Sequence, residues 1–185
     1  MRILAIPGSL RAGSHNVALA RAAVELAPRG VEIEVFDGLG ALPLYDDDLD
    51  GEETPQAVAD LRERISSADA LLVVTPEYNG SVSGVLKNAI DWASRPRGEA
   101  ALRGTTVAIA GVTTGQYGAM WAQQDLRRIL GIAGARVMDG DLPVSRAASV
   151  FNDSGRLVDE LVEERLRDHL AALASEVQVP VAAAA

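Results

Sequence analysis

The residues that could do chemistry begin with a short loop near the amino terminus, which carries hydroxyl and guanidinium groups between glycines. This loop, residues 7–14, follows the apolar run 2–6 and precedes a helical pattern. Glycine lets the backbone approach a ligand closely, and the free amides and dipole of a helix N-terminus favour an anion. Ser9, Arg11 and Ser14 add the donors that a phosphate needs. The loop therefore predicts a phosphate site; the alternative is a tight turn that only caps the helix with Ser14.

The spacing within this loop argues against two common nucleotide motifs. It has the two glycines of a Walker A loop, but Ser14 and His15 stand where lysine and Ser/Thr are required, so the cation that bridges β- and γ-phosphates is missing. The dinucleotide fingerprint G-x-G-x-x-G is also absent from the loop. Asp37 ends the second predicted strand, where a Rossmann fold has its ribose-binding acid, so that alternative stays open. A receiver domain would need an Asp where Thr75-Pro76 stands. A single terminal phosphate fits best.

Two further polar loops follow buried strands. Residues 76–81 follow the apolar run 70–74, which Thr75-Pro76 ends because proline has no amide for the strand ladder. Residues 112–118 follow the apolar run 105–111. In open α/β sheets, ligands bind at the carboxyl ends of the strands, so we expect the three loops to share one ligand.

Groups for acid–base or nucleophilic catalysis are scarce. The segment Gly80–Gly84 resembles a nucleophile elbow, but Val82 stands where the serine should be. His169 lies in a charged helical pattern and is expected at the surface. The acidic run 46–50 is expected to be a solvated face, so no metal site is predicted.

The order of apolar patterns predicts the elements that position these loops. Strands are expected at 2–6, 31–36, 70–74, 105–111 and 135–144, and the alternating 31–36 run indicates the sheet edge. Helices are expected at 14–27, 54–67, 83–94, 119–133 and within 155–177. The first helix is expected to bury Val17, Ala20, Val24 and Ala27. In the third, Ser83 is the expected cap and Lys87 is expected to pair with Asp91. The pattern predicts an α/β fold, a three-layer doubly wound five-stranded parallel sheet.

Composition sets outer limits on function. The 185 residues suit one domain, expected over 1–178 with a disordered tail at 179–185. The chain has no cysteine, which excludes disulfides and thiolate catalysis and fits a cytoplasmic protein. No apolar run reaches bilayer length, so no membrane insertion is expected. A formal net charge of −9 argues against nucleic acid as a partner.

Three segments together closely resemble the NADPH-dependent FMN reductases, a group that includes bacterial chromate and quinone reductases and related azoreductases. They are residues 8–16, 76–81 and 84–92, which read GSLRAGSHN, PEYNGS and GVLKNAIDW. The resemblance covers most of the chain in the same order and spacing. It implies a flavodoxin-like fold with strand order 2-1-3-4-5, FMN at the carboxyl edge, and homodimers or homotetramers. The sequence departs from the family at His15, often apolar or aromatic there, and at Ser83, commonly proline.

The site residues that the resemblance implies all lie in the three loops. The FMN phosphate would be held by Ser9, Arg11, Ser14 and Asn16, with His15 at the ligand's edge. The isoalloxazine and ribityl groups would be lined by Pro76, Glu77, Tyr78, Asn79, Gly80 and Ser81. The other side of the ring would be closed by Thr113, Thr114, Gly115, Gln116 and Tyr117, up to Gly118. Tyr45 and Asp46 are secondary candidates, because in the family this loop approaches the flavin of a neighbouring subunit.

The resemblance also implies an enzyme. It would take hydride from NADPH or NADH through FMN and reduce a small acceptor, namely a quinone, free flavin, an azo compound or a chromate-like oxyanion. Hydride transfer is the cofactors' own reaction, so no catalytic side chain is expected. The alternative is a flavodoxin-like electron carrier or flavin-binding protein with a protein redox partner. Trp92 and Trp121 are expected in the core or in a subunit contact, whereas Tyr117 could equally stack on a ligand.

Overall fold

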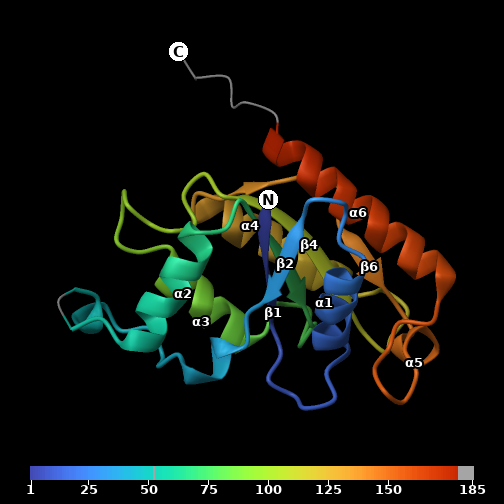
Figure 1. The fold of residues 1–185 in the computed structure, drawn as a ribbon. Coiled ribbons are helices and arrows are strands. Elements are labelled where there is room, and N and C mark those ends of the chain that lie inside the picture. The colour runs from blue at the N-terminus through green and yellow to red at the C-terminus, as the bar shows by residue number, and fades with distance from the viewer. Residues whose placement is uncertain (52, 179–185) are drawn as a thin grey trace.

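The computed structural model describes residues 1–51 and 53–178 and shows a central sheet between two layers of helices (Figure 1). The strands are β1 (Arg2–Pro7), β2 (Glu32–Val35), β3 (Ala70–Thr75), β4 (Thr106–Val112), β5 (Arg136–Val137) and β6 (Leu142–Val144). The helices are α1 (His15–Glu25), α2 (Gln56–Ser66), α3 (Gly84–Ala93), α4 (Met120–Ile132), α5 (Ala147–Val150) and α6 (Glu160–Gln178), with short 3-10 turns η1 (Gly38–Ala41) and η2 (Asp47–Leu49).

The sheet is parallel throughout, in the order β2-β1-β3-β4-β5, with β6 also paired to β4. The predicted fold class and flavodoxin-like strand order are therefore confirmed. The single domain over 1–178 stays a prediction, and the expected disordered tail at 179–185 lies outside the described residues. Among the helices of the described residues, none combines the length and apolar character that crossing a bilayer needs.

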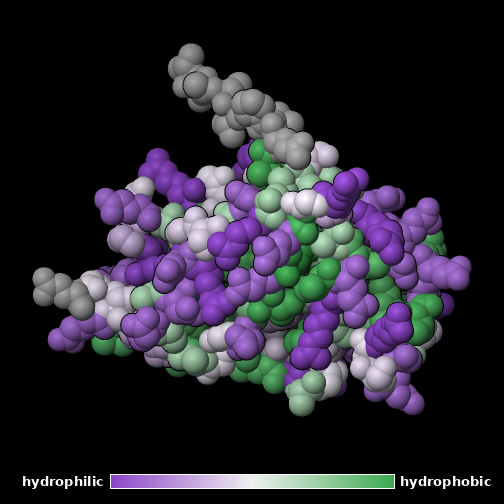
Figure 2. Space-filling view, viewed as in Figure 1, coloured by the Kyte–Doolittle hydropathy of each residue, from purple (hydrophilic) through white to green (hydrophobic). Residues whose placement is uncertain are grey.

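The two hydrophobic cores lie on opposite faces of the sheet. Successive residues of a strand point to opposite faces, so in β3 Leu72 packs with α1 and α6 while Leu71 and Val73 pack with α2, α3 and α4. This explains why β3 reads as a continuous apolar run: both of its faces are covered. Figure 2 shows mostly hydrophilic side chains on the outer surface, with hydrophobic ones between them.

The fifth strand differs from the prediction of one continuous element at 135–144. Residues 138–141 separate β5 from β6, and Gly140 in this segment has a positive φ of 82°. Both short strands still pair with β4, through Thr106 opposite Arg136 and Ala110 opposite Leu142. The extra residues of the glycine-containing segment interrupt the pairing without moving the chain off the sheet.

The buried face of α1 also differs from the expected one. Of the four expected residues only Ala20 is fully buried, and Val24 is 43% exposed. The helix instead turns Asn16 and several alanines toward the sheet. The prediction placed the valines inside because they are more hydrophobic than alanine. The small alanines are buried instead, and they allow α1 to pack closely on the sheet.

His169 was expected at the surface, and this is wrong: its side chain is only 8% exposed. It lies on the face of α6 that carries Leu166, Leu170 and Leu173 into the core. The surrounding charged residues occupy the outer face of the helix and concealed this pattern in the sequence. Burial lowers the pKa of the imidazole, the Ile109 backbone and Asp141 oppose the shift, and Nε2 is buried without a hydrogen-bond partner.

The burial of His169 predicts a loss of stability in mild acid. Because its folded pKa lies below the ordinary 6.5, the unfolded chain binds the proton more readily, and the unfolding free energy should fall as pH drops below about 6.5. Each unit of pKa depression corresponds to about 1.4 kcal/mol. Urea unfolding at pH 7.5 and 5.5 measures the loss, and His169→Leu should reduce it. His15→Gln removes the other, more exposed histidine and should keep most of it; an undiminished loss in His169→Leu would contradict this account.

Candidate functional site

The first loop is held in place by its own backbone and by Ser14. The Ser9 amide donates to the Pro7 carbonyl at 2.9 Å, and the Ser14 amide donates to the Arg11 carbonyl at 3.1 Å. Ser14 Oγ accepts from the Val17 amide at 3.4 Å, which confirms that it caps α1. Ser9, Arg11 and the N-terminus of α1 therefore lie close together in this loop.

Gly8 fixes this loop against the helix that follows the second loop. Its amide donates to the Val74 carbonyl at 2.8 Å, and Ser83 Oγ donates to its carbonyl at 2.6 Å. A Cβ at Gly8 would lie 2.9 Å from Leu86 Cδ2, so only glycine allows this approach. Ser83 also caps α3 by accepting from the Leu86 amide at 3.3 Å, as predicted.

Asn16 joins α1 to the end of β4. Its Nδ2 donates to the Val112 carbonyl at 3.1 Å, and its Oδ1 accepts from the Val112 amide at 3.1 Å. The side chain is buried and both of its polar atoms are bonded to backbone. Asn16 is therefore a positioning residue, which holds the start of α1 beside the third loop.

The second loop contains a tight turn at its tip. Tyr78 and Ser81 exchange two backbone hydrogen bonds, at 3.0 and 3.1 Å, across Asn79 and Gly80. Both central residues have positive φ, 53° and 74°. Asn-Gly is the pair that such a turn favours, because asparagine tolerates and glycine readily adopts this conformation.

Two side chains tie the second loop to α4. Glu77 Oε2 accepts from the Ala122 amide at 3.1 Å, in the first turn of the helix, where a carboxylate is favoured. Ser81 Oγ donates to Asp125 Oδ2 at 2.5 Å, and this bond, with Arg128, lowers the pKa of the Asp125 carboxyl. Two hydrogen bonds therefore join the loop after β3 to the first two turns of α4.

The third loop is held by the end of β6 and by the segment that follows it. The Thr113 amide donates to the Val144 carbonyl at 3.1 Å, and the Arg146 amide donates to the Gly115 carbonyl at 2.9 Å. Gly118 has φ 59°, and a Cβ there would lie 2.7 Å from the Val144 amide nitrogen. The glycine therefore lets the loop pass directly over β6.

A small open cleft of about 140 Å³ lies where the three loops meet. It brings together ten of the predicted site residues: Ser9, Arg11, Ser14, His15, Asn16, Pro76, Glu77, Tyr78, Thr113 and Thr114. The other six predicted residues do not line this cleft: Asn79, Gly80, Ser81, Gly115, Gln116 and Tyr117. Val112 also lines it and was missed, because its part depends on contact with Asn16 rather than on its own chemistry.

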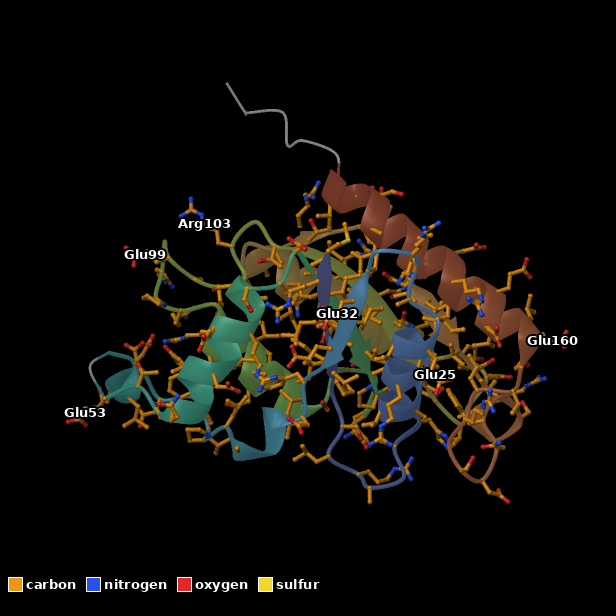
Figure 3. The ribbon with its side chains drawn as sticks, in the orientation of Figure 1. Glu25, Glu32, Glu53, Glu99, Arg103 and Glu160 are labelled. Atoms are coloured by element: carbon orange, nitrogen blue, oxygen red, sulfur yellow. The ribbon has the colours of Figure 1, made fainter. Side chains whose placement is uncertain are left out.

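The donor set of the cleft suits a phosphate. Two serines and Arg11 line the cleft at the N-terminus of α1, and in residues 1–51 and 53–178 Arg11 forms no ion pair that would occupy its guanidinium. Burial and the nearby Arg11 lower the pKa of His15, whose ring stacks on Phe151 at a centroid distance of 5.6 Å. Exposed acids such as Glu53, Glu99 and Glu160 lie at the periphery (Figure 3), and none of the three lines the cleft.

The secondary candidates have structural partners. Tyr45 OH donates to Asp47 Oδ1 at 2.6 Å, which raises the tyrosine pKa, and its ring meets Trp92 edge-on at 4.9 Å. Asp46 Oδ1 accepts from the Asp48 amide at 3.1 Å and caps η2. The acidic run thus shapes its own turn, and neither residue lines the cleft.

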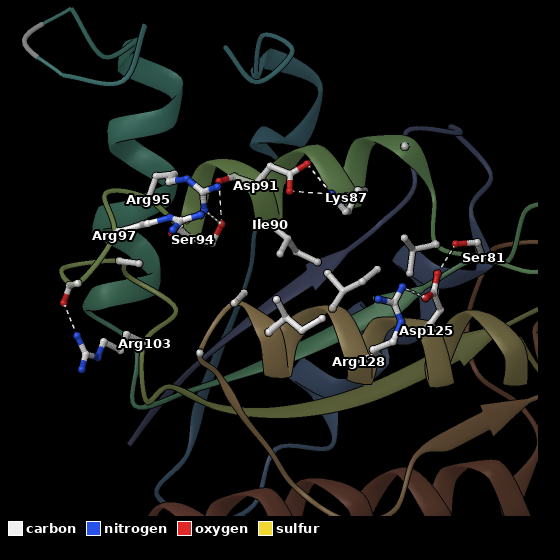
Figure 4. Close-up of a pocket in the computed structure, with 18 residues that line it drawn as sticks. Ser81, Lys87, Ile90, Asp91, Ser94, Arg95, Arg97, Arg103, Asp125 and Arg128 are labelled. Atoms are coloured by element: carbon white, nitrogen blue, oxygen red, sulfur yellow. Dashed lines mark hydrogen bonds and ion pairs between the residues drawn. The ribbon is translucent and has the colours of Figure 1, made fainter. Parts of the chain in front are cut away.

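A larger groove, which the sequence did not indicate, runs between α3 and α4 (Figure 4). Its volume is about 910 Å³, and it extends from Ser81 to Arg103 with Ile90 on its wall. The predicted pair of Lys87 and Asp91 lies along it at 2.7 Å and is confirmed. This groove lies beside the second loop but outside the cleft.

Comparison with known proteins gives consistent results. Residues 1–149 match the family described as NADPH-dependent FMN reductase. The chain is 42% identical over 174 residues to a NAD(P)H-dependent FMN reductase from Pseudomonas aeruginosa, covering 94% of this chain and 93% of the relative. It is 41% identical over 159 residues to a quinone reductase from Pseudomonas putida, covering 85% of each. Among solved structures, a flavoenzyme NAD(P)H:(acceptor) oxidoreductase from Paracoccus denitrificans has a TM-score of 0.86 and 34% identity, covering 96% of this chain and 97% of that one.

The buried amide of Asn16 predicts a stability effect that does not depend on any ligand. Asn16→Ala removes two hydrogen bonds and leaves the amide and carbonyl of Val112 unpaired, so we expect a loss of about 2–4 kcal/mol in unfolding free energy. Urea denaturation measures it. Gln124→Ala removes an exposed amide from α4 and should change stability by less than about 0.5 kcal/mol. Equal effects of the two substitutions would show that the bond to Val112 contributes nothing.

Proposed function

The chain belongs to the NADPH-dependent FMN reductase family, and from that premise we propose that it is an NAD(P)H-dependent FMN reductase that acts on quinones. The observation that carries the proposal is the convergence of Ser9, Arg11 and Ser14 on one cleft at the N-terminus of α1. This donor set suits the single terminal phosphate of FMN. The cleft also lies at the carboxyl edge of the sheet, where folds of this type hold their ligands.

The protein's part in the reaction is to bind and orient. FMN, when bound, supplies the two-electron chemistry between a nicotinamide and an acceptor. Overall, NAD(P)H and one proton reduce a quinone to its hydroquinone and leave NAD(P)⁺. Arg11 and the helix N-terminus would hold the phosphate, and the loop of Tyr78 and the segment 113–117 would flank the ring. The reaction requires no nucleophilic side chain.

The quinone is our first choice of acceptor because relatives of 41% and 40% identity are named quinone reductases. Free flavin, azo compounds and chromate-like oxyanions remain further proposals, as does the preference between NADPH and NADH. The alternative, an electron carrier with a protein redox partner, differs in one respect: it would not accept electrons from a nicotinamide directly. A cytoplasmic location stays a prediction.

A homodimer or homotetramer also stays a proposal, but its expected contact must change. Trp92 was expected either in the core or in a subunit contact, and the second alternative is wrong: the side chain is fully buried, and Nε1 donates to the Pro43 carbonyl at 2.9 Å. Its placement in the core is the other half of the prediction and is confirmed. Any subunit contact on this side would use other residues of α3 and α4.

Reduction by nicotinamide separates the enzyme from the electron carrier. When NADPH or NADH is added anaerobically to the purified holoprotein, we expect the yellow absorbance of oxidised flavin to bleach without any partner protein. Adding a quinone should then restore it. The visible absorbance band of the oxidised flavin follows both steps. Flavin that stays oxidised with both nicotinamides would favour the carrier.

The phosphate assignment predicts different losses for two flavins. A hydrogen bond to a charged group contributes roughly 1.5–3 kcal/mol, so Arg11→Ala should weaken FMN about 10- to 100-fold. Riboflavin lacks the phosphate, and its affinity should barely change. Fluorescence titration of apoprotein with both flavins supplies the constants.

Two controls make this comparison specific. Arg29→Ala removes an exposed arginine from the turn that follows α1 and should leave both affinities unchanged. Asn79→Gly keeps the positive-φ turn and removes only the side chain, so it should affect FMN and riboflavin equally if Asn79 contacts the ring. If Arg11→Ala lowers the affinities for FMN and riboflavin equally, Arg11 does not bind the phosphate and the assignment of the first loop is wrong.

A further inference from the structure

The exposed aromatic side chains are unevenly distributed over the molecule. The chain has two tryptophans, three tyrosines and two phenylalanines. Both phenylalanines and Trp92 are buried, and Tyr45 is partly buried. The exposed rings are Tyr78 at 54%, Tyr117 at 51% and Trp121 at 45%. All three follow the carboxyl ends of β3 and β4, so the exposed rings gather at the edge where the cleft lies.

Two of these rings are in contact, and the loops that carry all three are joined by a hydrogen bond. Tyr117 and Trp121 lie with ring centroids 4.9 Å apart and planes tilted by 58°. Tyr78 follows Glu77, whose carboxylate accepts from the Ala122 amide next to Trp121 at 3.1 Å. One hydrogen bond therefore joins the backbone beside Tyr78 to the backbone beside Trp121.

A cluster of exposed aromatic rings is costly to keep in water and marks a binding surface when it lies beside a ligand site. Tyr78 also lines the cleft. The exposed aromatic residues therefore adjoin the polar cleft and add an apolar surface beside it. Met120, 39% exposed, adds a polarisable thioether next to Trp121. The three rings carry no formal charge, so this surface suits a flat, neutral ligand and offers nothing to an oxyanion.

We propose that Tyr78, Tyr117 and Trp121 form an aromatic platform that binds a planar quinone and makes the enzyme prefer fused-ring quinones to inorganic acceptors. This rests on the proposed function, because it names the acceptor's binding surface for that same reaction. Offset or edge-to-face contacts between rings contribute favourably beyond simple burial. A second ring on the quinone should therefore improve binding, whereas a compact inorganic acceptor cannot use the platform.

Steady-state kinetics of the holoenzyme with Trp121→Ala test the platform. At fixed NADPH, KM should rise about 3- to 10-fold for a naphthoquinone, rise less for a benzoquinone, and stay unchanged for ferricyanide. Turnover at saturating quinone should stay near that of the wild type. Trp121→Phe keeps a ring and should restore most of the affinity for the naphthoquinone.

Matched controls separate the platform from the flavin site and from assembly. Leu161→Ala removes an exposed apolar side chain from α6, 64% exposed in the wild type, and should change no KM. FMN content and anaerobic reduction by NADPH should be unchanged in Trp121→Ala, so a failure of the proposed function would appear there independently. Three results would overturn the platform: equal rises in KM for ferricyanide and naphthoquinone, loss of FMN, or dissociation of an oligomer with the loss of all activities. The last would assign these rings to a second copy of the chain.

Discussion

Parallel pairing of β1, β3 and β4 brings three strand ends to one edge, and every feature of the site depends on it. Pro7 lies opposite Val74, and Thr75 lies opposite Gly111, so the loops that follow these strands start at the same level. The amide of Gly8 continues this pairing by one further bond to Val74. Without this alignment the donors of the first loop and the polar groups of the other two would face separate regions of solvent.

Side chains then join the loops in pairs. Asn16 connects the start of α1 to the end of β4, Ser83 connects α3 to Gly8, and Glu77 connects the second loop to α4. The bonds of Asn16 and Ser83 reach backbone groups of a strand end and of a loop, and the bond of Glu77 reaches an amide in the first turn of α4 that lacks a partner within the helix. The cleft is consequently framed by bonds that no ligand needs to form, and the protein can orient a cofactor without reorganising. Preorganisation of this kind suits a protein whose cofactors carry the chemistry.

Local chemistry accounts for what the sequence predicted, and distance along the chain accounts for what it missed. Ser14 and Ser83 could be predicted as helix caps because each bonds to an amide only three positions away. Asn16 bonds to Val112, 96 positions along the chain, and Glu77 bonds to Ala122, 45 positions away. No spacing rule reveals such partners. His169 shows the same limit, since its burial is decided by which side of α6 meets the sheet and not by its charged neighbours.

The central claim is that an FMN phosphate lies against Arg11 at the N-terminus of α1. The most direct test is a pH titration of the phosphorus resonance of FMN bound to the wild-type protein, followed by ³¹P NMR. A free phosphate monoester loses its second proton at about pH 6, and its resonance moves accordingly. Held by a guanidinium and helix amides, the dianion should be stabilised, so the bound resonance should stay constant between about pH 5 and 8. A bound resonance that titrates as free FMN does would place the phosphate in solvent and contradict the account.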